Sequence, residues 1–301
     1  MTLDGRGRIF VADDINHRVA VFRPDGRFLQ FMGRRGNGPG EFQQPWLVAT
    51  DTQDSVFVWD LGLSRITVFD NTLRYRRDFR IPPQWLVTGI EFLPNGRLLV
   101  AAYGPNEPGT LHVLDRNGTR RHTFGPRLGR QDLAGFEASL LGGYVDFSTS
   151  GQSIVYTNKS PYYIDFYAPS GQPRNRCVGR ADWTTPPAQV VVRSSRTDAL
   201  NWKRYVHSSG ILDLGNGLFL NSIHDPVGDR RILHLLTSDC TLVGRVVFDH
   251  PLVIADRRGS KLVAVRNLEY PEVIVYDMRV LQRRVGTRVS RPAGPSQETQ
   301  R

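Results

Sequence analysis

The chain has few cysteines and no long apolar run. None of its hydrophobic segments approaches the roughly 20 residues that cross a bilayer, and Cys177 and Cys240 are its only cysteines. Two cysteines do not make a disulfide framework and have no metal-ligand spacing, so we interpret them as small buried apolar residues. Hydrophobic residues make up 40% and charged residues 23% of the chain, a balance typical of a globular protein without a transmembrane segment.

Lysine is also scarce, although the formal net charge is +10. Of the 39 basic residues only Lys159, Lys203 and Lys261 are lysines, and the arginines are scattered along the chain. Scattered charge is typical of a solvated surface, so the sequence disfavours nucleic acid as a partner. RNA binding is a third hypothesis that rests on net charge and on analogy alone.

What the chain does have is an internal repeat. Residues 7–22 read GRIFVADDINHRVAVF and residues 54–69 read DSVFVWDLGLSRITVF: a β-rich run, an acidic residue, a polar turn, an arginine and a second β-rich run. Each is followed by a turn and a third strand, and in several copies an apolar run precedes the unit, as at 46–49, 87–92 and 252–255. Similar units recur at 95–124, 151–178, 215–248 and 259–285.

Six units of four strands predict an all-β fold, a six-bladed β-propeller with four-stranded antiparallel blades. A pair of β-sandwiches is disfavoured, because sandwiches need no four-strand unit repeated at this period. The expected blades are 1–33, 43–80, 86–125, 139–178, 206–248 and 251–286, with an insertion at 179–205 and a disordered tail at 287–301. Only residues 1–3 precede the first unit, so we expect the first blade to lack most of its innermost strand.

Two motifs resemble a known family. Residues 11–22, VADDINHRVAVF, resemble the core of an NHL repeat, and residues 36–42, GNGPGEF, followed by Pro45, resemble the connector that such repeats place between blades. The resemblance is to bacterial six-bladed propeller proteins, and it is sharp over residues 4 to about 80.

The cellular compartment depends on where the chain begins. No basic segment followed by an apolar run is visible at the N-terminus. If the true start lies upstream, an export signal there would favour a periplasmic or extracellular location, and otherwise a cytoplasmic one.

Function is expected on one face. Turns between second and third strands and connectors between blades emerge together in a propeller, and loops of this kind carry ligand sites. All five tryptophans fall in or beside these segments; we interpret Trp46 and Trp85 as filling gaps between blades. The candidate ligand-binding residues are Trp59, Arg65, Tyr103, Lys159, Tyr163, Trp183, Trp202, His224 and Asp225. Their aromatic and charged side chains suit a protein, peptide or glycan.

The first hypothesis is therefore a monomeric, non-enzymatic binding propeller with no cofactor. The alternative is a metal-dependent lyase or lactonase, because amidating lyase, gluconolactonase and strictosidine synthase are also six-bladed propellers. The lyase and lactonase families imply histidine or acidic ligands around the central channel. His224 with Asp225 is the candidate here for Ca or Zn, although no histidine pair has zincin spacing and no Gly-x-Ser-x-Gly occurs. Asp13, Asp60, Arg18 and Arg65 recur at matching positions, and we expect each aspartate to pair with the arginine of its own turn.

Overall fold

A computed structural model gives the fold of most of the chain. The residues it describes are 1–126, 143–148, 152–158, 163–178, 207–225, 230–248, 252–258, 260–266 and 272–277. Lys159, the insertion at 179–205 with Trp183 and Trp202, and the tail at 287–301 lie outside these ranges. In the described residues no helix is long and apolar enough to cross a membrane.

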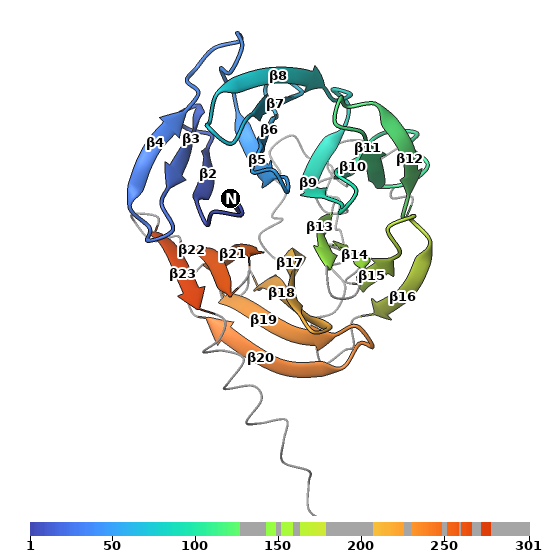
Figure 1. The fold of residues 1–301 in the computed structure, drawn as a ribbon. Coiled ribbons are helices and arrows are strands. Elements are labelled where there is room, and N and C mark those ends of the chain that lie inside the picture. The colour runs from blue at the N-terminus through green and yellow to red at the C-terminus, as the bar shows by residue number, and fades with distance from the viewer. Residues whose placement is uncertain are drawn as a thin grey trace, which may run out of the picture.

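Six antiparallel sheets stand around a common axis (Figure 1). The first blade contains β1 (Thr2–Leu3), β2 (Ile9–Asp13), β3 (Arg18–Phe22) and β4 (Phe28–Met32). The second contains β5 (Pro45–Thr50), β6 (Val56–Asp60), β7 (Arg65–Phe69) and β8 (Tyr75–Arg80), and the third β9 (Leu86–Phe92), β10 (Leu98–Tyr103), β11 (Leu111–Leu114) and β12 (Arg120–Phe124).

The second half of the ring repeats this plan. The fourth blade contains β13 (Gly143–Ser148), β14 (Ser153–Asn158), β15 (Tyr163–Tyr167) and β16 (Pro173–Val178). The fifth contains β17 (His207–Gly215), β18 (Leu218–Asp225), β19 (Arg230–Thr237) and β20 (Leu242–Phe248), and the sixth β21 (Leu252–Arg258), β22 (Lys261–Arg266) and β23 (Glu272–Asp277).

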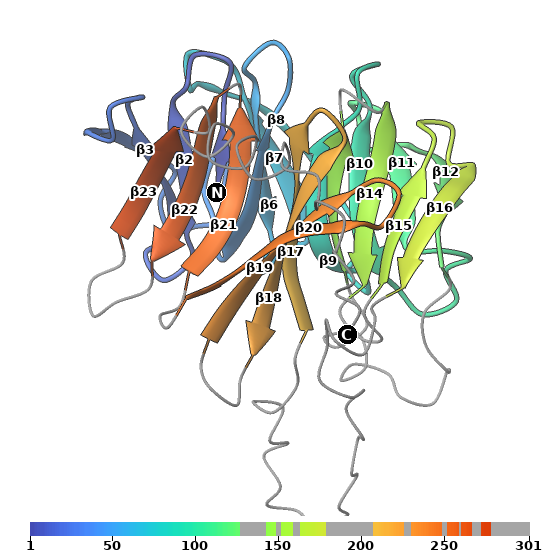
Figure 2. The same cartoon turned by 90° about the horizontal axis from the view of Figure 1, so that it is seen from below.

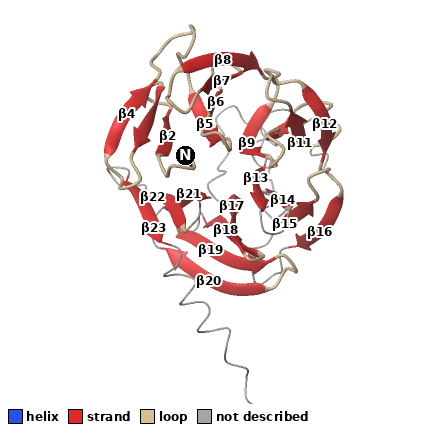
Figure 3. Cartoon of the chain, viewed as in Figure 1, coloured by secondary structure: helices blue, strands red, loops and turns tan. Residues whose placement is uncertain are grey.

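The predicted six-bladed propeller is confirmed. Each blade runs from an inner to an outer strand in chain order, and the described elements are all strands and loops (Figures 2 and 3). β1 has two residues, as expected for a first blade short of its innermost strand. The sixth blade differs from expectation, because its described residues form three strands instead of four.

Burial follows the position of each strand in its blade. Strand β6 reads VFVWD and is buried along its whole length, since a middle strand packs against neighbouring blades on both faces. The outermost strand β8 reads YRRDFR and is only partly buried. Charged outer strands of this kind also protect a sheet edge from pairing with other chains.

One contact recurs at the seams between blades. The fifth residue of an outer strand lies against the turn that joins the third and fourth strands of the next blade. A Cβ on Gly118 would collide with the ring of Phe79, and a Cβ on Gly171 would lie 2.8 Å from the ring of Phe124. Both glycines have positive φ, 86° and 88°, a conformation that a side chain disfavours. Glycine therefore meets both the conformation of the turn and the space left by the aromatic ring.

At the next seam the same two positions hold the cysteines. Cys177 is the fifth residue of β16, Cys240 lies in the turn between β19 and β20, and their sulfurs form a disulfide of 2.13 Å. In Figure 1 the β19–β20 hairpin reaches across to β16. The interpretation of these residues as separate small apolar side chains was wrong. Their separation of 63 residues hides the fact that the repeat places them at one seam.

Acidic side chains on the inner strands connect neighbouring blades near the axis. Asp256 of β21 accepts hydrogen bonds from Thr2 Oγ1 and the Leu3 backbone N–H, both at 2.6 Å, and so holds the short strand β1 against the last blade. Asp146 of β13 accepts a 2.5 Å hydrogen bond from the backbone N–H of Asp213 in β17. The Asp256 carboxylate of the last blade therefore helps to close the ring by holding the two-residue strand β1 in place.

The pKa of Asp146 is raised to about 7, mainly by burial and also by the negative charges of Asp256 and Asp213, against the opposing effect of its hydrogen bonds from backbone N–H groups. The unfolded chain has the ordinary aspartate pKa near 4. The native state therefore binds more protons than the unfolded state between about pH 4 and 7, and stability falls as pH rises through this range.

We predict that Asp146→Asn removes this component, because asparagine can still accept the hydrogen bond from Asp213 N–H without carrying a charge. The free energy of unfolding of wild type should fall relative to the variant by about 3 kcal/mol between pH 5 and 8.5, since the native pKa lies about two units above pH 5 and each unit corresponds to about 1.4 kcal/mol. Urea unfolding across this pH range measures the difference. Asp25→Asn, in an exposed turn, is the control, and parallel pH profiles for wild type and Asp146→Asn would contradict the prediction.

Candidate functional site

The loop face is built where the connector 33–44 crosses from the first blade to the second. The buried Asp60 carboxylate, at the end of β6, accepts hydrogen bonds from the backbone N–H groups of Gln43 (2.7 Å), Gln44 (3.0 Å) and Leu63 (3.0 Å). On the first blade, the His17 ring contacts the carbonyl of Gln43 through Nδ1. The end of the connector is thus held by the turns of both blades.

Arg65 holds the rest of the same connector. Its guanidinium donates to the carbonyl oxygens of Asn37, Gly38 and Glu41 at 2.7–3.1 Å, and it lies 3.5 Å from the carboxylate of Asp78. The side chain is only 13% exposed. Arg65 is therefore placed as an anchor of the loop, although the sequence placed it among the ligand-binding residues.

The predicted pairing of aspartate with arginine occurs in the first blade but not in the second. Asp13 and Arg18 form an ion pair of 3.2 Å. Asp60 and Arg65 are cross-strand neighbours, yet each turns to the connector, whose backbone supplies both N–H donors and carbonyl acceptors. Hydrogen bonds to the long connector thus replace the ion pair between Asp60 and Arg65. Comparing the sequences of the two units does not reveal this, because the partners are backbone groups.

The predicted aromatic residues differ in exposure. Trp59 is 1% exposed and belongs to the apolar core between the second and third blades, so its ring is not available to a ligand. Tyr163 is also buried, with the Arg176 guanidinium 4.3 Å from its ring centre, and burial raises its pKa to about 12. Tyr103, at the end of β10, is partly exposed. The structure does not gather these three residues into one surface site.

The residues of the metal hypothesis are only partly described. His224 and Asp225 are the last two residues of β18, and the register pairs His224 with His207. The side chains of all three lie outside the described part of the chain. Within the described residues no three histidine, cysteine or acidic side chains are grouped as metal ligands.

Two exposed apolar residues on the loop face were missed as site residues. Trp46 is 49% exposed and Ile15, in the turn between β2 and β3, is 82% exposed; we call these two residues the loop-face patch because they share this face, and not because of a contact between them. Trp46 lies where the register between β5 and β6 shifts between Pro45 and Leu47, so it is the extra residue of a bulge. A bulge is not visible in the sequence, and the interpretation of Trp46 as a gap filler was wrong.

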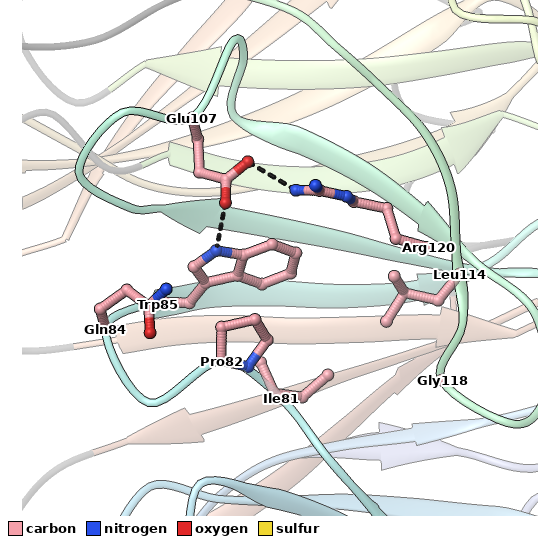
Figure 4. Close-up of a pocket in the computed structure, with 8 residues that line it drawn as sticks. All are labelled: Ile81, Pro82, Gln84, Trp85, Glu107, Leu114, Gly118 and Arg120. Atoms are coloured by element: carbon pink, nitrogen blue, oxygen red, sulfur yellow. Dashed lines mark hydrogen bonds and ion pairs between the residues drawn. The ribbon is translucent and has the colours of Figure 1, made fainter.

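Trp85 does fill a gap, and it forms one wall of a small pocket between the second and third blades (Figure 4). It is 3% exposed. Its Nε1 donates to Glu107 Oε1 at 2.9 Å, and Arg120 Nη1 lies 2.6 Å from Glu107 Oε2. The pocket has a volume of about 340 Å³ and is lined by Ile81, Pro82, Gln84, Trp85, Glu107, Leu114, Gly118 and Arg120.

His112 supports this pocket from inside the blade. Its ring stacks on Trp85 with 3.9 Å between ring centres, and Nδ1 is 2.9 Å from Thr123 Oγ1. Burial lowers the pKa of His112 to about 4, so the imidazole is neutral at neutral pH. With Glu107 engaged by Trp85 and Arg120, these side chains form a structural network that holds the connector before β9 against the third blade.

We predict that Asp60→Ala destabilises the protein by about 2–3 kcal/mol, because three backbone N–H groups that converge on a buried carboxylate lose their acceptor. Asp13→Ala is the matched control: it occupies the same position in the first blade but is partly exposed, so its cost should stay near 0.5 kcal/mol. Thermal or urea unfolding measures both. Equal costs would mean that Asp60 does not anchor the connector.

Comparison with known proteins agrees with this geometry. Residues 3–88 match the DUF5128 family model, described as a 6-bladed beta-propeller. NHL repeat-containing protein 3 from mouse is 26% identical over 114 residues, which span 33% of this chain and 30% of that protein. The human protein of the same name is 27% identical over the same shares. The match thus spans less than a third of the length of these curated relatives.

Solved structures resemble the whole ring. A member of the DUF4221 family from Bacteroides vulgatus has a TM-score of 0.62 at 11% identity, covering 91% of this chain and 95% of that one. A streptogramin B lyase has a TM-score of 0.56 at 10% identity, covering 92% and 81%. Identities this low establish the fold alone. The chain is a six-bladed β-propeller whose first two blades match DUF5128 and which has distant homology to NHL repeat-containing protein 3 over a third of its length.

Proposed function

We propose that this propeller is a non-enzymatic binding protein that holds a protein, peptide or glycan on its loop face. The observation that carries the proposal is the loop-face patch. Tryptophan is enriched among the residues that dominate binding energies, because it buries a large rigid surface and offers one N–H donor. A half-exposed tryptophan on a bulge is a ready contact for a ligand.

The surroundings of the patch support binding over catalysis. Asp60 and Arg65, the charged residues of the second blade's turn, are engaged in holding the connector. Rigid loops reduce the entropy lost when a ligand binds, so this use of charge is favourable for a binding surface. Catalysis instead requires titratable groups free to face a substrate.

Ile15 favours a peptide or protein over a glycan. An aliphatic side chain that is 82% exposed gains most by burial against another apolar side chain. Glycan sites rely on aromatic faces together with polar groups, and Trp46 alone would serve either ligand. The combination of Ile15 and Trp46 suits an apolar segment of a peptide.

The proposal is tested with the purified full chain on peptide and glycan arrays, followed by titration of the strongest probes. We expect peptide probes to bind, and Trp46→Ala to weaken them at least about tenfold, corresponding to about 1.4 kcal/mol of lost contact. Ile15→Ser should weaken the same probes, because it removes apolar surface from the same face.

Phe28→Ala is the matched control, since Phe28 is 50% exposed, close to the value for Trp46, but lies on the outer strand β4. It should leave binding unchanged. Retained binding by Trp46→Ala, or equal losses in all three variants, would overturn the assignment to the loop face. Binding to glycans alone would overturn the choice of a peptide ligand.

A further inference from the structure

The seam between the fourth and fifth blades departs from a pattern that the preceding seams share. At three consecutive seams the fifth residue of the outer strand packs against a turn of the next blade, at a residue with positive φ. Met32 and Leu73 pack in one apolar cluster, Phe79 lies on Gly118, and Phe124 lies on Gly171. At the fourth seam these equivalent positions are Cys177 and Cys240.

Cysteine is a poor choice for the turn position taken alone. The backbone of Cys240 has φ of 72°, in the left-handed region that costs a residue with a side chain roughly 1–2 kcal/mol. Glycine avoids this cost at the two equivalent positions of the third and fourth blades. Turn conformation therefore does not explain a cysteine at position 240.

Cysteine is equally unexplained at the strand position. Phe79 and Phe124 fill their seams with an aromatic ring, whereas the side chain of Cys177 is much smaller and yet is 2% exposed. A lone small residue would leave such a seam underpacked, which is costly in a protein interior. Both cysteines are explained at once if the bond between them replaces the apolar contact.

We infer that Cys177–Cys240 is a permanent structural cross-link, and that the protein matures and works in an oxidising compartment. The chain has no other cysteine, and structural disulfides form and persist in secreted, extracellular and periplasmic proteins but are rare where thiols are kept reduced. This inference does not depend on the proposed ligand.

Formation of the bond is a two-electron oxidation. The two thiols lose two electrons and two protons as the S–S bond forms, and a disulfide-donating thiol–disulfide oxidoreductase is reduced to its dithiol. The packing of blades four and five supplies proximity, because Cys177 belongs to an apolar cluster that draws on both blades, with Ile164 and Phe166 from the fourth and Phe219 and Leu236 from the fifth, and Cys240 packs against this cluster. Folding of this seam thus selects the pairing.

The first test is thermal unfolding of the full chain with and without dithiothreitol. We expect the reductant to lower the Tm of wild type by about 10 °C, because it reopens a loop of about 60 residues in a protein of this size. The double variant Cys177→Phe with Cys240→Gly restores the residue pair found at the two preceding seams. It should fold, and its Tm should not respond to the reductant.

The second test concerns the compartment. Source cells are quenched in acid, and free thiols are alkylated under denaturing conditions, in one sample directly and in a second sample after reduction. Mass spectrometry then counts the alkylated cysteines of the protein in each sample. We expect no alkylated cysteine before reduction and two after it. Alkylation of both cysteines before reduction, or a wild-type Tm that the reductant leaves unchanged, would overturn the inference. Loss of folding in Cys177→Ala with Cys240→Ala, together with the stable Phe/Gly variant, would support it.

Discussion

The contact between an outer strand and the next blade's turn sets the geometry of the ring. Blades of a propeller are wedges, so their inner strands touch readily while their outer strands spread apart. A side chain that reaches from the fifth position of one outer strand onto the neighbouring turn closes that widening gap. Phe79 on Gly118, Phe124 on Gly171 and the Cys177–Cys240 bond are three chemical solutions to this one constraint. The inner carboxylates Asp146 and Asp256 connect the blades at the axis.

Because the seams fix the blades, the loop face can be held by few side chains. Asp60 and Arg65 bind the backbone of the same connector. The Asp60 carboxylate accepts hydrogen bonds from backbone N–H groups, and the Arg65 guanidinium donates to backbone carbonyls. These two residues explain why a glycine-rich segment with many conformations in the unfolded chain is held in one. These two charged side chains hold the loop, while Ile15 and Trp46 are exposed apolar side chains on the same face.

The sequence predicted what repeats and missed what differs between copies. Strand periodicity and turn residues recur in each unit, so the six blades and the short first strand could be predicted from residues 1–69 and their weaker copies. Exposure of Trp46 depends on a single-residue bulge, and burial of Trp59 depends on packing against the third blade; neither leaves a local pattern. The disulfide could have been found by aligning the fifth strand position and the turn position across blades, because Cys177 and Cys240 are then the pair equivalent to Phe124 and Gly171.

Exposed apolar residues lie at both seams of the sixth blade, where one partner of this contact falls outside the described residues. Its three described strands supply no outer strand, and Gly26, the turn residue that such a strand would meet in the first blade, has no atom within 4 Å of a Cβ built on it. Phe28, beside that turn, is 50% exposed, and Phe31 of the same strand is 46% exposed. On the other seam Val246, the fifth residue of β20, is 53% exposed, and the turn it would meet follows β23, outside the described residues. Where both partners of the contact are described, the outer-strand residue is fully buried, as Met32 and Cys177 are, or partly buried, as Phe79 and Phe124 are.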